Sequence, residues 1–270
     1  MKTVKISTEN AEFQVINALK TNREKRNHKG FIFEGVRNIN NAIKYGWDIK
    51  SFFFSSEKGL SGWARNILKN SQAECCYDLS LYLLNILSNK EEPSELLALA
   101  NISKDNLSKI TIKKDLLVVV FDRPSSPGNL GTIIRSCDAI GADGLIITGH
   151  AVDVYDPETI SATTGSLFSL PIVRLSSQNE LELWIQKVKK ILPSLEVVGT
   201  DENGAETIYE HDFKKPAIIL AGSEKWGLSA GYKELADVMV KIPMQGSASS
   251  LNVAVATSII ISEVKRQRNE

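Results

Sequence analysis

Residues 116–148 read LLVVVFDRPSSPGNLGTIIRSCDAIGADGLIIT, and this stretch decides the fold of the second half of the chain. The run Leu116–Phe121 is entirely apolar, and Leu145–Thr148 is a second apolar run of strand length. Between them, apolar residues recur at helical spacing over Leu130–Ile140. Strands that are apolar on both faces and alternate with helices are typical of a parallel sheet covered on both sides. The stretch therefore predicts one strand–helix–strand unit of such a sheet.

The same alternation continues to the end of the chain. Four more runs of strand length follow, at Ile172–Leu175, Val197–Thr200, Ala217–Ala221 and Met239–Ile242. Helical periodicity is clearest over Leu181–Leu192 and Leu251–Arg266. We therefore predict an α/β domain over residues 115–270, with a parallel sheet and helices on both faces. Because ligands of open α/β sheets bind at the carboxyl ends of the strands, the loops there are the first place to search for a site.

The first hundred residues predict a smaller α/β/α domain, which we place at residues 1–105. Helices are expected at Phe13–Leu19, Val36–Ile43, Leu60–Lys69 and Leu81–Leu87, and strands at Gly30–Glu34, Ile49–Ser55, Ala73–Tyr77 and Leu96–Ala100. Asn101–Lys114 is polar and rich in lysine, and it lacks a long apolar face. We therefore expect the domain boundary there.

Composition excludes several classes of protein. The 270 residues contain 32 Lys and Arg against 32 Asp and Glu, so the chain is neither a histone-like basic binder nor an acidic disordered one. The longest apolar run, Leu116–Phe121, is far shorter than the roughly 20 residues that a membrane helix needs. Three cysteines are too few, and too unevenly spaced, for a disulfide framework or a zinc site. We expect a reduced, cytoplasmic protein without a metal site or a membrane span.

The zero net charge conceals a basic first half. Residues 1–110 carry 16 Lys and Arg against 12 Asp and Glu. Part of this excess is a run of five cations within ten residues: Lys20, Arg23, Lys25, Arg26 and Lys29. Such a run is either the solvated face of a helix or an anion-binding edge. A second basic group, Lys265, Arg266 and Arg268, ends the chain.

Two common motifs are absent from the sequence. No G-x-G-x-x-G follows the first strand of the second half, and no G-x-x-x-x-G-K-[ST] occurs. The only histidines are His28, His150 and His211, and no local motif places one of them beside a serine nucleophile. Dinucleotide-binding, P-loop and serine-hydrolase functions are therefore not supported.

Three loops combine glycines with polar side chains at points where a strand meets a helix. They are Pro127–Gly141, Ile219–Ser229 and Val240–Ala256. Taken singly, each has a structural interpretation: Asn129 and Ser250 would cap helices, and Glu224 would lie near a helix N-terminus, where its charge is favourable. The order and spacing of the three loops, taken together, indicate a shared functional site instead.

Together the three loops resemble the motifs of the SpoU (TrmH) family, SPOUT-class RNA 2′-O-ribose methyltransferases that use S-adenosylmethionine. The first resembles N-x-G-x-x-x-R-x-A, with Cys137 in place of the usual Ala; the second resembles G-x-E-x-x-G-[LM]-S; and the third resembles I-P-M-x-G-x-x-x-S-L-N-V-x-V-A. The matching residues are Asn129, Gly131 and Arg135, then Gly222, Glu224, Gly227, Leu228 and Ser229, then Ile242, Pro243, Met244, Gly246, Ser250, Leu251, Asn252, Val253, Val255 and Ala256.

The resemblance implies a fold, a cofactor and site residues. It implies a C-terminal trefoil knot, a homodimer whose site is completed across the interface, and S-adenosylmethionine as the cofactor. Arg135 would grip an RNA phosphate and stabilise charge on the reacting hydroxyl; it is a poor base because arginine stays protonated in proteins. Asn129, Glu224, Ser250 and Asn252 would organise the catalytic site. The cofactor would be held at Thr200, Gly222, Ile242, Met244 and Leu251.

A weaker resemblance covers the first hundred residues. Phe33–Arg37 and Leu79–Ala100 are similar to the family's ribosomal-protein-like RNA-binding domain. This layout favours large-subunit rRNA as the substrate, with Arg135 as an RNA contact. The candidate contacts to the RNA backbone are Lys20, Arg23, Lys25, Arg26 and Lys29, and also Lys265, Arg266 and Arg268. Upstream of Thr164–Pro171 the family often carries an Arg where this chain has Ser161. The alternatives are a tRNA 2′-O-methyltransferase, an enzyme that methylates a base nitrogen, and a non-catalytic RNA-binding protein of the same fold.

Overall fold

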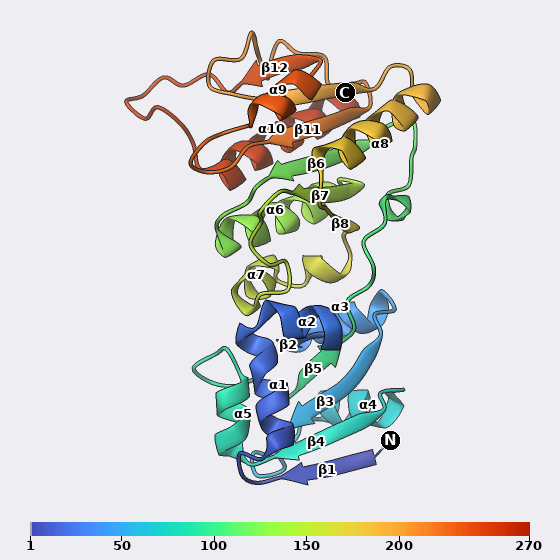
Figure 1. Cartoon of the computed structure of the whole chain (residues 1–270), viewed down its shortest axis with the longest axis vertical. Helices are drawn as coiled ribbons and strands as arrows, with labels where there is room; N and C mark the ends of the chain where they lie inside the picture. Colours follow the sequence, from blue (N-terminus) through green and yellow to red (C-terminus); the bar gives the residue numbers. More distant parts are fainter. Residues whose placement is uncertain (1) are drawn as a thin grey trace. The chain divides into compact units, whose positions relative to one another are not determined.

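The computed structural model describes residues 2–270 and divides them into two compact units. The first contains the chain up to Lys104 together with Tyr155–Ser169, and the second contains Asp105–Val154 and Leu170–Glu270. Figure 1 shows the helices and strands of both. Among the described residues, no helix is long and apolar enough to cross a membrane.

The first unit is built on a five-stranded mixed sheet. The strands lie in the order β1-β4-β3-β5-β2, with β1, β4 and β3 parallel and β5 antiparallel to both of its neighbours. Helices α1 and α5 lie side by side against this sheet (Figure 1), where Phe13, Phe53 and Leu83 are fully buried. The strands are β1 (Lys2–Ile6), β2 (Phe31–Glu34), β3 (Ile49–Phe54), β4 (Cys75–Leu79) and β5 (Leu97–Ala100), and the helices are α1 (Ala11–Thr21), α2 (Arg23–Lys29), α3 (Val36–Lys44), α4 (Gly62–Asn70) and α5 (Leu81–Leu87).

A segment from the middle of the chain belongs to this first unit by its contacts. It contains α7 (Pro157–Thr163) and the short 3-10 helix η2 (Ser166–Phe168). Phe168 stacks near Phe31 and Phe33, and its carbonyl accepts a 3.0 Å hydrogen bond from Trp47 Nε1. The sequence placed this segment within the 115–270 domain. Sequence position alone does not report these aromatic contacts, because their partners lie more than a hundred residues away.

The second unit is a seven-stranded sheet in which every strand pair is parallel, as predicted. The strand order is β10-β12-β9-β11-β6-β7-β8. Strand β6, next to the central strand β11, is buried along its whole length. The strands are β6 (Leu117–Asp122), β7 (Gly144–Thr148), β8 (Ile172–Leu175), β9 (Glu196–Thr200), β10 (Glu206–Thr207), β11 (Ala217–Ala221) and β12 (Val238–Lys241), and the helical segments are η1 (Leu107–Lys109), α6 (Pro127–Ile140), α8 (Gln178–Ile191), α9 (Ala230–Leu235) and α10 (Val253–Asn269).

Two helix starts differ from the prediction. Helix α6 is capped by Ser126, whose Oγ accepts from the N–H of Asn129, so Asn129 lies inside the first turn rather than at the cap. Helix α10 is capped by Asn252, not Ser250: Asn252 Oδ1 accepts from the N–H groups of Ala254 and Val255. Ser and Asn are both strong cap residues, so local sequence alone does not choose between neighbouring candidates.

Candidate functional site

The carboxyl ends of four adjacent parallel strands bring the motif loops together. Strands β12, β9, β11 and β6 are consecutive neighbours in the sheet, so the residues that follow them share one edge. Thr200 at the end of β9 pairs with Val240 of β12, and its Oγ1 donates a 2.9 Å hydrogen bond to the carbonyl of Leu220 in β11. The predicted cofactor residues Thr200, Gly222 and Ile242 therefore lie at or directly beyond the ends of three neighbouring strands.

The loop after β11 folds back on itself as a tight turn. The N–H of Ser223 donates to the carbonyl of Gly227, and the N–H of Gly227 donates to the carbonyl of Ser223, both at 3.0 Å. A Cβ at Gly222 would lie 2.2 Å from the carbonyl carbon of Gly227, so the turn can close only around glycine. This turn holds Glu224 in place.

Glu224 ties this turn to the start of α6. Its Oε2 accepts from the N–H of Ser125 at 3.1 Å and from Ser125 Oγ at 2.7 Å, and its Oε1 accepts from Asn129 Nδ2 at 3.1 Å and from the N–H of Ser126 at 3.2 Å. Partial burial by itself raises the pKa of this carboxyl, but the hydrogen bonds from Ser125 and Asn129 outweigh it and leave the pKa lowered. Glu224 is therefore ionised at neutral pH.

Asn129 extends the connection to the third loop. While its Nδ2 donates to Glu224, its Oδ1 accepts a 3.0 Å hydrogen bond from Asn252 Nδ2. Asn252 in turn caps α10. Glu224, Asn129 and Asn252 thus form a chain of side chains across all three loops, and we call it the loop-linking chain. Each member fixes the amide orientation of the next.

Arg135 stands apart from this chain. It is exposed on α6, and within residues 2–270 its side chain makes no hydrogen bond or ion pair. An arginine without a partner keeps all five N–H donors of its guanidinium for a ligand, in a fork that suits a phosphate.

The remaining predicted residues lie in the loop between β12 and α10. Ser250 and Met244 are exposed there, Ile242 and Leu251 are half-buried, and the loop-linking chain does not include them. The structure therefore joins Glu224, Asn129 and Asn252 into one constellation, whereas it leaves Ser250 and Met244 free to meet a ligand.

Sequence reasoning missed four residues beside this constellation. Asp122 is buried at the end of β6, where its carboxylate binds Arg123 Nε and Nη2, both at 3.0 Å, and accepts from the N–H of Ser229 at 3.1 Å. Arg123 Nη2 also donates to the carbonyl of Gly227 at 3.3 Å. With Ser125 and Ser126, these residues anchor the turn after β11. Their position directly after a buried strand, at the edge where ligands bind, is the signal that could have identified them.

The basic run of the first unit divides into structural and exposed cations. Arg26 is only 3% exposed, and its Nη1 donates to the carbonyls of Leu19 at 2.9 Å and Lys20 at 2.7 Å. Lys20 Nζ donates to the carbonyls of Ile86 and Ser88, and burial lowers its pKa despite the nearby Glu34. These two residues hold helix ends together, so donors that were predicted to contact RNA are engaged within the first unit. Arg23, Lys25 and Lys29 are exposed on α2.

Two of the three C-terminal cations, Arg266 and Arg268, are also engaged within the protein. The guanidinium of Arg268 donates to the carbonyls of Asp115, Leu116, Phe213 and Lys215. Arg266 forms ion pairs with Glu263 and Glu270. These contacts anchor the end of α10, so a role in RNA binding finds no support there.

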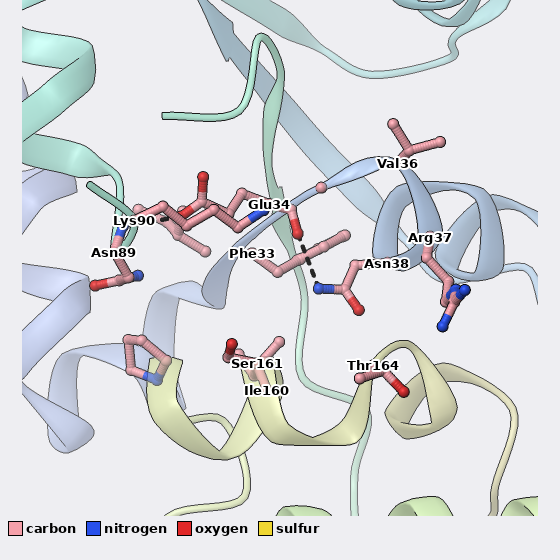
Figure 2. Close-up of a pocket in the computed structure, with 13 residues that line it drawn as sticks. Phe33, Glu34, Val36, Arg37, Asn38, Asn89, Lys90, Ile160, Ser161 and Thr164 are labelled. Carbon is pink, nitrogen blue, oxygen red and sulfur yellow. Dashed lines mark hydrogen bonds between the residues drawn. The ribbon is translucent and has the colours of Figure 1, made fainter. Parts of the chain in front are cut away.

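A cavity of about 280 Å³ lies within the first unit, between the start of α3 and α7 (Figure 2). Arg37 and Lys90 supply its positive charge, and Ser161 and Thr164 line it from α7. Ser161, where the family often carries an Arg, therefore faces a cavity that already contains an arginine from α3.

Comparisons with known proteins agree with the motifs. Residues 116–262 match the SpoU rRNA Methylase family, and residues 10–98 match the SpoU L30e-like domain. A 23S rRNA (uridine(2479)-2′-O)-methyltransferase of Streptomyces viridochromogenes is 43% identical over 265 residues, which are 98% of this chain and 92% of that protein.

Solved structures agree over the whole length. The SpoU methyltransferase AviRb from Streptomyces viridochromogenes, in complex with the cofactor AdoMet, has a TM-score of 0.93 at 44% identity and covers 97% of this chain and 99% of its own. An AdoMet-bound rRNA methyltransferase from Sinorhizobium meliloti has a TM-score of 0.85 at 28% identity, with 98% of each chain covered. With its three motif loops joined at one edge of a parallel sheet, and with more than half of its length matched to the family, this chain belongs to the SpoU rRNA methylase family.

Proposed function

We propose that this protein transfers the methyl group of S-adenosylmethionine to a ribose 2′-hydroxyl of large-subunit ribosomal RNA. The observation that carries the proposal is the loop-linking chain, which joins three separate motif loops at the carboxyl edge of the sheet. The Streptomyces relative named above is a 23S rRNA 2′-O-methyltransferase, and two of the similar structures contain AdoMet.

The residues at the sheet edge fit this cofactor. Three neighbouring strand ends present backbone groups at Thr200, Gly222 and Ile242, and the tight turn at Gly222 brings two backbone segments close together. Such an edge can hold a nucleoside by backbone hydrogen bonds, with Ile242 and Leu251 as apolar wall. When bound, S-adenosylmethionine supplies an activated methyl group on a sulfonium.

The protein's own contribution is positioning and charge stabilisation. Arg135 binds a phosphate of the RNA, which places the neighbouring ribose in line with the methyl group. The same guanidinium stabilises negative charge that develops on the 2′-oxygen as its proton leaves. Arg135 does not take the proton, because it remains charged in proteins; water or another group accepts it. Glu224 and Asn129 hold the helix that carries Arg135 in register with the cofactor loops.

We assign RNA recognition to residues 1–105 and the chemistry to residues 115–270. In the first domain, Arg23, Lys25 and Lys29 on α2 are the exposed cations of the basic run. Changing these three residues to glutamate is expected to weaken RNA binding and to reduce its salt dependence by about one ion for each lost phosphate contact. An unchanged affinity and salt slope would remove α2 from the interface.

We further propose a homodimer, the family's trefoil knot and a cytoplasmic location, where ribosomal RNA is found. The dimer is supported by a groove along α6 and α10, whose lining includes Ile140, Val255 and Ile259. Val255 is 47% exposed and the neighbouring Tyr209 is 60% exposed, which is unusual for side chains of this size clustered on one face. A second copy would cover these apolar side chains.

The test uses purified protein, radiolabelled S-adenosylmethionine and unmodified RNA separated into large rRNA, small rRNA and tRNA. Label in large rRNA that survives alkali as a dinucleotide is the expected result, because a 2′-O-methyl group blocks cleavage at that position. Label only in tRNA would select the tRNA alternative, and alkali-labile label would indicate a methylated base. Cofactor and RNA binding without label in any fraction, even with assembled ribosomal subunits, would leave the non-catalytic alternative.

A further inference from the structure

Trp226 is an exposed aromatic residue that the loop-linking chain does not use. Its side chain is 71% exposed, the highest value among the large hydrophobic residues that the structure describes. Trp usually buries most of its surface. It lies two residues after Glu224, on the same turn after β11, so an exposed indole ring is carried by a loop of the candidate site.

The backbone that carries Trp226 is held rigidly. Ser223 Oγ accepts a 3.2 Å hydrogen bond from the N–H of Trp226, and the two backbone bonds between Ser223 and Gly227 close the turn around it. Gly227 has φ +63°, in the left-handed region that favours glycine. Arg123 holds the carbonyl of Gly227 from outside the turn. A ring on such a fixed support loses little conformational entropy when it binds a ligand.

A cation accompanies the ring. Lys225 Nζ lies 4.8 Å from the centre of the Trp226 ring, within the range of a cation–π contact. An aromatic face beside a positive charge is the combination that proteins use for single-stranded nucleic acid, in which the base stacks and the phosphate is neutralised. A protein partner would have no general need for the ammonium group, so the pair favours a polyanion.

We propose that Trp226 and Lys225 form a nucleotide-stacking subsite for the RNA substrate. The indole stacks on an unpaired base close to the methylated ribose, and the Lys225 ammonium contacts a phosphate next to that base. Because Glu224 fixes the same turn to Asn129, the stacked base is held in register with the helix that carries Arg135. This inference rests on the proposed function for its choice of substrate.

The experiment measures the dissociation constant of unmodified large-subunit rRNA for the full-length protein and its variants. Trp226→Ala is expected to raise the dissociation constant about tenfold, whereas Trp226→Phe, which keeps a stacking face, stays near wild type. Trp226→Leu separates stacking from simple apolar contact and should behave like the alanine variant.

The contribution of the ammonium group is tested separately. Lys225→Ala should lower the salt dependence of RNA binding by about one ion. Leu183→Ala, which removes a 57% exposed apolar side chain from α8, outside the domain assigned to RNA recognition, is the control and should leave the dissociation constant unchanged.

Three results would overturn the subsite. The first is an unchanged dissociation constant in Trp226→Ala, and the second is full affinity in Trp226→Leu. The third is weaker binding that accompanies loss of the dimer, measured by light scattering, because Trp226 would then be an interface residue. Binding of S-adenosylmethionine, measured by calorimetry, should be equal in all variants.

Failure of the subsite can be distinguished from failure of the proposed function. If wild-type protein binds RNA through Trp226 but methylates none, the proposed function fails and the subsite stands. If wild-type protein binds no RNA, both fail.

Discussion

At the residue scale, Glu224 has the most demanding position in the candidate site. Its carboxylate accepts four hydrogen bonds from residues 125–129, and those bonds need the ionised form. No amide can reproduce this arrangement, because the NH2 group of a glutamine would face donors instead of accepting from them.

We expect Glu224→Gln to lower the rate of methyl transfer roughly tenfold to a hundredfold, through misplacement of the loops rather than loss of a reacting group. Rates measured at saturating cofactor and RNA test this. Glu180→Gln is the matched control, since Glu180 also accepts from serines at a helix start in the same unit. Equal rates for the two variants would show that the loop-linking chain is not needed for activity.

Glu224 also predicts a pH dependence. Its pKa is lowered in the folded protein from an ordinary value of 4.5. Its contribution to stability is therefore fully present above pH 4.5 and is lost only as the pH falls through the lower, folded value. Thermal unfolding of wild type and Glu224→Gln, compared from pH 7 to pH 3, should show a difference that is constant above pH 5 and shrinks below it. A difference that grows on acidification would contradict the assignment.

Arg135 carries the second residue-scale prediction. Because it is exposed and makes no bond within residues 2–270, Arg135→Ala should leave the unfolding temperature and cofactor affinity unchanged while methyl transfer falls about 10²- to 10³-fold. Arg135→Lys keeps the charge but loses the two-pronged contact, so it should recover only part of the rate. Full activity in Arg135→Ala would remove this residue from the mechanism.

At the scale of elements, the last turn of α10 is fastened by one side chain. Arg268 donates to four carbonyls from two separate segments. Arg266, two residues earlier and half exposed, pairs instead with the exposed Glu270 and with the buried Glu263, which also accepts from Gln267. We expect Arg268→Ala to reduce the free energy of unfolding by about 1–3 kcal/mol, because two partly buried and two exposed carbonyls lose a charged donor together. Arg266→Ala should cost about 0–1 kcal/mol. Denaturant titration measures both, and equal losses would contradict the prediction.

The corner between α1 and α2 also contains one buried cation and one exposed cation, whose substitutions should differ in their effect on stability. Arg26 is buried against the last carbonyls of α1, and Lys25 beside it is exposed. Arg26→Met should therefore destabilise the protein by about 2–3 kcal/mol, while Lys25→Met should be nearly neutral. RNA affinity should show the opposite pattern: Lys25→Met should weaken RNA binding, whereas Arg26→Met, assayed well below its unfolding temperature, should not. Weaker RNA binding in Arg26→Met alone would restore Arg26 to the interface.

At the scale of the whole molecule, the groove along α6 and α10 exposes apolar side chains that a second copy could cover. A charge in its wall should prevent a second copy from covering it. Val255→Glu is expected to convert dimers to monomers in light scattering, whereas Leu183→Glu, at a 57% exposed apolar position on α8, should leave the assembly unchanged. Wild-type protein that is monomeric at micromolar concentration would refute the dimer directly.

Most of the architecture could be predicted because it depends on local periodicity. Strands β6, β7, β8, β9, β11 and β12 lie within one or two residues of their predicted positions. The motif spacing also led to Glu224, Asn129 and Asn252, which the fold joins through side-chain bonds. Asp122 and Arg123 escaped notice because their partners, Gly227 and Ser229, are about a hundred residues away in sequence.

The sequence by itself determined the fold class, the family and the order of the three motif loops, since each is encoded in the identity and spacing of nearby residues. Only the tertiary structure decided which of several similar residues does each task. It buried Arg26 and left Lys25 exposed, made Asn252 rather than Ser250 the cap of α10, and placed residues 155–169 with the first unit. The burial of a side chain and its hydrogen-bond partners depend on contacts between elements that are distant in sequence. Periodicity along the chain reports local secondary structure and does not predict those contacts.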